Sequence, residues 1–258
     1  MDLNLADKVF LITGGTDGLG LALAEGLVEE GAAVAVCGRN EERLRSAQAR
    51  LEDGGGDALA RKADVTRAEE VEGFVDAAVA RWGRIDGVVH NAGRAAAGRL
   101  ESVGDEEWNA DLQLKLMGAV RLTRMALPQL RASRGAVLFT LALAAKAPGG
   151  GSAPSSVSRA AGMALMKALS KELGPDGVRV NAVLVGLVES GQWVRAAGSA
   201  GQDLAEFYRR SAENAGIPLG RFGRSREFAD LGCYLLSGRS SYVTGCAVNL
   251  DGGLSPAV

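Results

Sequence analysis

Short apolar runs alternate with longer stretches in which apolar residues recur every three to four positions, from the first residues to about position 186. The runs at 9–13, 33–37, 58–63, 87–91, 136–141, 178–185 and 247–250 predict strands. The stretches at 19–30, 41–52, 68–82, 106–131, 155–173 and 226–236 predict helices. This alternation is typical of a parallel sheet covered by helices on both faces. We therefore predict an α/β fold of doubly wound type.

Residues 187–219 break this rhythm, because the segment is polar and interrupted by glycines. It follows directly after a predicted strand, and open α/β sheets bind ligands beyond the carboxyl ends of their strands. We therefore predict that 187–219 is a lid that covers the substrate. No repeat or second domain is visible, so the prediction for 1–258 is a single domain.

The composition excludes several classes of protein. With 29 basic and 31 acidic residues the formal charge is -2, which offers no positive field for nucleic acid or anionic lipid. The three cysteines lie far apart in the sequence, so no disulfides are expected. The chain does not start with a basic segment followed by an apolar run, and it contains no apolar stretch of membrane-spanning length. We therefore predict a cytoplasmic protein without membrane spans. His90 is the only histidine, so no histidine-built metal site is expected.

A glycine-rich turn, Thr13-Gly14-Gly15-Thr16-Asp17-Gly18-Leu19-Gly20, lies between the first predicted strand and the first helix. Glycines allow a sharp turn and close approach to a pyrophosphate, whose charge meets the N-terminus of the helix. In this position the turn predicts a dinucleotide site. Arg39 follows the second strand where NAD-preferring proteins carry a carboxylate. It favours NADP(H) over NAD(H) by pairing with a 2′-phosphate, although Asp17 adds a nearby negative charge that opposes it.

Four motifs in order resemble the short-chain dehydrogenase/reductase family: the turn at 13–20, Asp64-Val65, His90-Asn91-Ala92-Gly93, and Asp251-Gly252-Gly253. The resemblance spans nearly the whole chain. It implies a Rossmann-type sheet of seven parallel strands, a nicotinamide cofactor and a homo-oligomer, usually a tetramer. It also implies that Asp64 and Val65 hold the adenine and that Asn91, Ala92 and Gly93 support the cofactor. His90 is interpreted as structural. The predicted cofactor-binding residues are Gly14, Thr16, Asp17, Gly18, Leu19, Gly20, Arg39, Asp64, Val65, Asn91, Ala92, Gly93, Arg159, Gly186 and Val188.

The family's catalytic positions, Asn, Ser, Tyr and Lys, are all substituted in this chain. Aligned by local sequence and spacing, they correspond to Lys115, Ala142, Ser155 and Arg159. Ala142 offers no hydrogen bond to a substrate carbonyl. Ser155 has too high a pKa and too short a side chain to replace a phenol. Arg159 can still bind the nicotinamide ribose but cannot release a proton near neutral pH.

Lys115, on the long helix, is the predicted replacement acid. Burial and the charge of Arg159 would push it toward its neutral form; alternatively, it points away or pairs with Asp111 one helical turn back. Tyr208 is a weaker candidate, since an aromatic in this segment usually serves packing. Lys146 is a possible pocket residue without an evident partner. The predicted catalytic residues are Lys115, Ser155 and Arg159.

The segment after the sixth predicted strand retains Gly186 and the hydroxyl of Ser190 but lacks the family's proline. Gly186 and Val188 are expected to face the nicotinamide carboxamide. Trp193, Phe207 and Tyr208 in the lid suggest a small-molecule substrate with apolar character.

Three hypotheses for function remain open on the sequence. The first is an atypical NADP(H)-dependent oxidoreductase acting on a carbonyl or alcohol, with Lys115, water or the substrate supplying the proton. The second is a catalytically silent dinucleotide-binding homologue that serves as a sensor or structural subunit. The third is a non-redox enzyme using Lys115 or Glu189 as a base.

Overall fold

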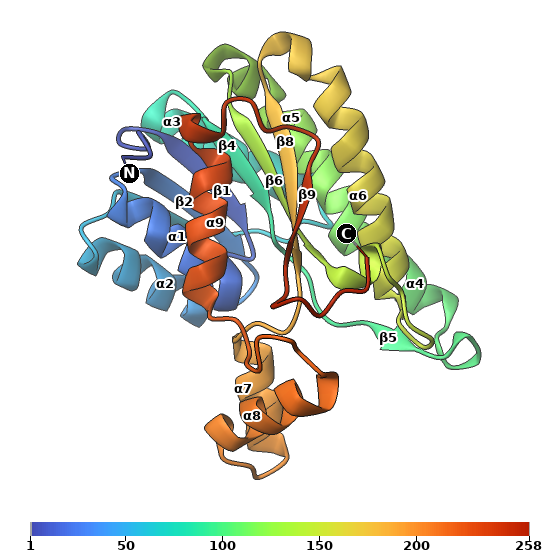
Figure 1. Cartoon of the computed structure of the whole chain (residues 1–258). Coiled ribbons are helices and arrows are strands. Elements are labelled where there is room, and N and C mark those ends of the chain that lie inside the picture. The colour runs from blue at the N-terminus through green and yellow to red at the C-terminus, as the bar shows by residue number, and fades with distance from the viewer. Residues whose placement is uncertain (1, 258) are drawn as a thin grey trace.

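The computed structural model describes residues 2–257. Its centre is a sheet of seven parallel strands in the order β3-β2-β1-β4-β6-β8-β9 (Figure 1). The strands are β1 (Val9–Thr13), β2 (Ala33–Gly38), β3 (Ala58–Lys62), β4 (Gly87–His90), β6 (Ala136–Ala142), β8 (Arg179–Val185) and β9 (Ala247–Leu250). The predicted Rossmann-type, single-domain fold is confirmed.

Helices cover both faces of the sheet. The elements are α1 (Gly18–Glu29), α2 (Glu41–Asp53), α3 (Ala68–Trp82), α4 (Asp105–Leu112), α5 (Gly118–Ser133), α6 (Ser155–Glu172), α7 (Gly191–Ser199), α8 (Leu204–Ala215) and α9 (Ser225–Leu236). Alternate residues of β1 enter opposite cores: Leu11 packs with residues of α3, α5 and α6, while Phe10 and Ile12 pack with residues of α1, α2 and α9. Burial on both faces explains why the central strands are continuously apolar.

The predicted helix at 106–131 is wrong in its middle. The helix α4 ends at Leu112, a π-helical turn runs through Gln113–Met117, and α5 begins at Gly118. No proline or glycine lies within Gln113–Met117, so the interruption left no sequence signal. A π-helical turn inside an α-helical run is frequent at functional sites, and Lys115 lies at its centre.

The predicted lid contains two helices, α7 and α8, which form a lobe below the sheet in Figure 1. Trp193, Tyr208 and Phe222 pack together there, with ring centroids 5.7 Å apart for Trp193 and Phe222 and 4.8 Å for Tyr208 and Phe222. These aromatic side chains thus form the lobe's own small core, and they are no longer evidence for an apolar substrate.

Two short strands outside the main sheet, β5 (Ala97–Gly98) and β7 (Ala153–Pro154), pair antiparallel. Within residues 2–257, no helix is both long and apolar enough to span a bilayer. Within the same range, no three His, Cys, Asp or Glu side chains gather as a metal site would require.

Candidate active site

The strand order reverses at β1, which pairs with β2 on one side and β4 on the other. Open parallel sheets bind ligands at such a reversal, outside the carboxyl ends of the strands. Thr13 ends β1, and its hydroxyl joins β1 to β4 and to the residues that follow β4. It accepts from the backbone N–H of Asn91 at 3.0 Å and of Ala92 at 3.1 Å, and it donates to the carbonyl of Val89 at 3.2 Å. The predicted phosphate-binding turn and the Asn91–Gly93 segment are therefore brought together.

Glycine is required in the turn after β1. Gly14 has a φ of 64°, and a Cβ on it would lie 2.9 Å from the Cα of Ala92. A Cβ on Gly20 would lie 2.4 Å from both the side-chain nitrogen of Asn91 and the carbonyl oxygen of Gly14. Asn91 donates from that nitrogen to the carbonyls of Thr13 and Gly14, at 3.1 and 3.0 Å. These contacts hold the turn open to a ligand at the N-terminus of α1, where Leu19 follows Gly18.

Asp17 caps α1, accepting from the backbone N–H of Gly18 at 2.7 Å. Its other oxygen lies 3.1 Å from Arg195 of α7 and 3.8 Å from Arg43 of α2. The negative charge expected to oppose a phosphate is therefore compensated by two arginines.

The predicted adenosine-binding residues line one cavity of about 240 Å³, which includes Gly14, Thr16, Arg39, Asp64, Val65, Ala92 and Gly93. Arg39 is 71% exposed and lies 3.5 Å from Asp64. Burial acts to raise the pKa of Asp64, but hydrogen bonds from Thr66 and the charge of Arg39 hold it below its ordinary value. Asp64 is therefore a carboxylate that can accept a hydrogen bond from an amino group, and Arg39 is free enough to turn toward a phosphate.

The segment after β8 borders the same turn. The buried Ser190 hydroxyl has no hydrogen-bond partner among residues 2–257, and its Cβ would lie 3.3 Å from a Cβ on Gly18. The amide of Gly186 donates to the carbonyl of Leu250 at 3.0 Å, which leaves only its own carbonyl for a ligand. Gly223 forms a β-bridge with this segment: its amide donates to the carbonyl of Leu187, and its carbonyl accepts from the amide of Glu189. The amide and carbonyl of Val188 are therefore not used in that bridge. An orphaned hydroxyl at the N-terminus of α1 fits a phosphate-bearing ligand.

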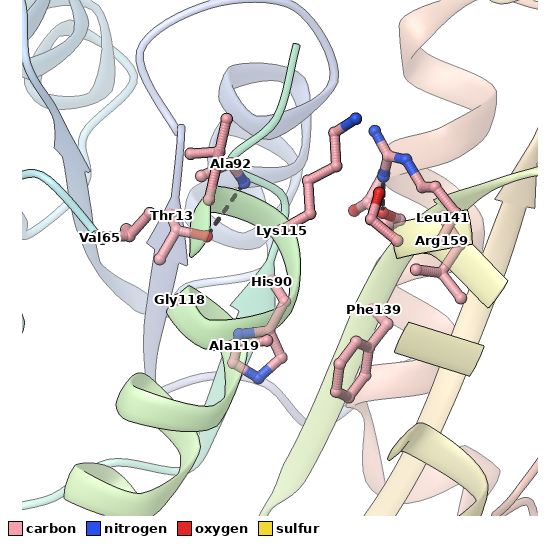
Figure 2. A pocket seen from close by; sticks show the side chains of 13 residues that line it. Thr13, Val65, His90, Ala92, Lys115, Gly118, Ala119, Phe139, Leu141 and Arg159 are labelled. Atoms are coloured by element: carbon pink, nitrogen blue, oxygen red, sulfur yellow. Dashed lines mark hydrogen bonds between the residues drawn. The ribbon is translucent and has the colours of Figure 1, made fainter. Parts of the chain in front are cut away.

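The structure brings Lys115, Ser155 and Arg159 together. The Nζ of Lys115 lies 2.5 Å from the Oγ of Ser155 and 2.5 Å from a carboxylate oxygen of Asp111. The side chain of Lys115 is 4% exposed. Figure 2 shows that Lys115 and Arg159 extend toward the same end of a small cavity of about 20 Å³. Lys115 thus points into the site and also pairs with Asp111, so the two positions that the sequence offered as alternatives occur together.

The charges around this ammonium oppose one another. Burial lowers the pKa of Lys115, the nearby Arg159 and Arg94 lower it further, and Asp111 raises it; the net direction is downward. Arg159 donates to the backbone carbonyl of Thr140. Burial lowers its pKa, and Asp111 opposes this, yet a guanidinium stays charged at neutral pH. The site therefore holds a proton on Lys115 less tightly than an exposed lysine would.

The remaining sequence candidates have other surroundings or partners. His90 lines the same small cavity. Its ring bonds Thr123 at 2.8 Å and packs at a tilt against Phe139, and burial lowers its pKa to about 3, so it is a neutral structural residue. Tyr208 belongs to the aromatic core of the lid. Lys146 donates to the carbonyl of Ala247 at 3.1 Å, a partner that the sequence did not reveal. Ala142 ends β6 without a polar side chain.

The family model for enoyl-(acyl carrier protein) reductase matches residues 14–255. The chain is 32% identical to a 3-oxoacyl-(acyl carrier protein) reductase from Thermotoga maritima, over 98% of this chain and 99% of that protein. The chain is a short-chain dehydrogenase/reductase. It is therefore an oxidoreductase of that family type.

Two solved structures extend the comparison. One is the NADPH-bound structure of a short chain oxidoreductase from Pseudomonas aeruginosa PAO1 that contains an atypical catalytic centre. Its sequence is 37% identical to this chain, the match covers 98% of each chain, and the TM-score is 0.93. L-Sorbose reductase from Gluconobacter frateurii, complexed with NADPH and L-sorbose, has 32% identity, full coverage of both chains and a TM-score of 0.95.

Proposed function

We propose that this chain is an atypical NADP(H)-dependent oxidoreductase that reduces a carbonyl group, with Lys115 and Ser155 supplying the proton. The observation that carries the proposal is the 2.5 Å contact between the Nζ of Lys115 and the Oγ of Ser155. Lys115 and Arg159 line the same small cavity near the sheet's reversal point. The relatives that bind NADPH, one with an atypical catalytic centre, support it.

The residues present fit the cofactor. The turn at 14–20 and Ser190 would hold its diphosphate, Arg39 its 2′-phosphate, Asp64 and Val65 its adenine, and Arg159 its nicotinamide ribose. When bound, the reduced nicotinamide supplies a hydride to the substrate carbonyl carbon. The preference for NADP(H) over NAD(H) rests on Arg39 and on the two NADPH-bound relatives.

The proton must reach the carbonyl oxygen as negative charge develops there. Ser155 alone is a poor acid, because its hydroxyl would have to ionise. With Lys115 behind it, Ser155 gives its proton to the substrate oxygen and receives one from the ammonium in the same step, so the serine never carries a charge. Arg159 adds a fixed positive charge that stabilises the developing oxyanion. The pair thereby performs the task for which the family uses a tyrosine. Because the Ser155 side chain is shorter than a phenol, the substrate oxygen must lie closer to α6 than it does beside a tyrosine.

We further propose that residues 187–219 cover the substrate. The lid borders the N-terminus of α1 through Ser190 and through the ion pair of Arg195 with Asp17. These contacts hold the segment beside the diphosphate turn, and closure from there over the substrate would exclude water from the reaction.

Two measurements on the purified protein test the proposed function. Fluorescence titration with NADPH and NADH should show binding, with NADPH bound more tightly. The absorbance of the reduced nicotinamide should then fall in the presence of some members of a panel of ketones, including 3-oxoacyl thioesters and ketoses. Tight binding of NADPH without turnover on a broad panel would instead support the silent homologue.

A further inference from the structure

Asp111 is a buried carboxylate that the family's catalytic positions do not include. Its side chain is 1% exposed, whereas Asp105, Glu106 and Glu107 of the same helix are exposed. A buried carboxylate is costly unless it is paired and hydrogen-bonded. Its contacts should therefore indicate what it does.

Both oxygens of Asp111 contact the active site. One lies 2.5 Å from the Nζ of Lys115, and the other accepts from the Ser158 hydroxyl at 2.6 Å. Ser158 lies on α6 between Ser155 and Arg159, so the carboxylate joins α4 to the helix that carries the other two proposed catalytic residues. The π-helical turn begins two residues after Asp111 and carries Lys115.

Asp111 is also the group that opposes the loss of charge on Lys115. The charged groups that face this ammonium are Asp111 from α4, Arg159 from α6 and Arg94 from the segment after β4. Burial and both arginines lower the pKa of Lys115, and Asp111 alone among the three charges raises it. Without the carboxylate, a buried ammonium would face only cations.

We propose that Asp111 is a positioning residue of the reduction: anchored by Ser158, it holds the Lys115 ammonium against the Ser155 hydroxyl. This inference rests on the proposed function. The role of Asp111 then has a specific consequence for activity, because a proton donor must be protonated before each turnover. Asp111 thereby decides which fraction of the enzyme is ready to react at a given pH.

The variant Asp111→Asn tests the proposal without changing the shape of the side chain. Asparagine can still accept from Ser158 but carries no charge. The chain has six lysines, so lysine labelled with ¹³C at Cε gives a simple NMR spectrum in which Lys115→Met identifies the signal of Lys115. In the cofactor-free protein, the titration midpoint of Lys115 should move to lower pH by about one unit or more in Asp111→Asn.

The matched control is Asp86→Asn. Asp86 is also a buried carboxylate, 6% exposed, that accepts from the backbone of Val9 and pairs with Arg84 and Lys8. It precedes β4, at the opposite end of that strand from the site. Asp86→Asn should reduce thermal stability and leave the titration of Lys115 in place.

Kinetics supply the second readout. Asp111→Asn should lower kcat at pH 8 by about tenfold or more, with KM changed little, and its pH profile should decline at lower pH than that of the wild type. Asp111→Glu restores the charge and should recover part of kcat. If Asp111→Asn does not fold, Ser158→Ala, which removes only the anchor, should shift the titration of Lys115 in the same direction by less.

An unchanged Lys115 titration in Asp111→Asn, or in Ser158→Ala if only that variant folds, overturns the proposal while leaving the proposed function intact. Full activity in Lys115→Met has a different meaning, because it removes the proposed function and the role of Asp111 with it.

Discussion

Replacing Thr13 by valine would remove the hydroxyl that joins β1 to β4 at the reversal of the sheet. Thr13 is 3% exposed, and valine has nearly the same shape, so no cavity forms. Three hydrogen bonds are lost, with Asn91, Ala92 and Val89. At about 1 kcal/mol each, the loss in unfolding free energy is about 3 kcal/mol. For a chain of this length, the melting temperature should fall by roughly 6–12 °C.

The assay is urea unfolding followed by circular dichroism, with Thr13→Ser as the control. Serine keeps the hydroxyl and loses one buried methyl group, which costs about 1 kcal/mol. Thr13→Val should also weaken NADPH binding, because the same hydroxyl fixes Asn91 and the phosphate-binding turn. If Thr13→Val is no less stable than Thr13→Ser, the hydroxyl does not organise the switch point.

Three further outcomes are expected. Arg39→Ala should weaken NADPH binding by about tenfold and NADH binding little, since only NADPH offers a 2′-phosphate; equal losses in fluorescence titrations would contradict this role. Turnover requires the protonated form of Lys115, whose pKa lies below that of an exposed lysine. The rate should therefore fall as pH rises, at lower pH than free lysine titrates, and a flat profile through the alkaline range would argue against a lysine donor. Arg179→Met should destabilise the fold by about 3 kcal/mol in urea unfolding. The reason is that the Arg179 guanidinium bonds the carbonyls of Leu235 and Ser237 and the hydroxyl of Ser240. A loss below about 1 kcal/mol would mean that water replaces these bonds.

The sheet was predictable from the sequence because burial of both faces leaves a plain apolar signature. The prediction for 9–13 matches β1, whose residues are all buried, and that for 136–141 matches β6 except for its last residue. The strands β5 and β7 were missed because two residues cannot show a period of two. The helices α7 and α8 were missed because their apolar residues form a separate small core, which breaks the pattern set by the sheet.

The site was predictable in its parts and less so in its arrangement. Motif order located the turn at 14–20 and placed Lys115, Ser155 and Arg159. The sequence presented the pairing of Lys115 with Asp111 as an alternative to catalysis, since one-dimensional spacing cannot show that a single ammonium contacts Asp111 and Ser155 together. The anchor at Ser158 depends on contact between α4 and α6, and the π-helical turn that carries Lys115 left no signal in the sequence. The predicted homo-oligomer stays a prediction.

The most direct test of the central claim is the single-turnover rate of hydride transfer from bound NADPH in Lys115→Met. Methionine approximates the length of lysine and carries no proton, and the double variant Lys115→Met/Asp111→Asn avoids an unpaired buried carboxylate. Both should lose about a hundredfold or more in rate while binding NADPH about as tightly as the wild type. A wild-type rate in either variant would show that the proton comes from elsewhere.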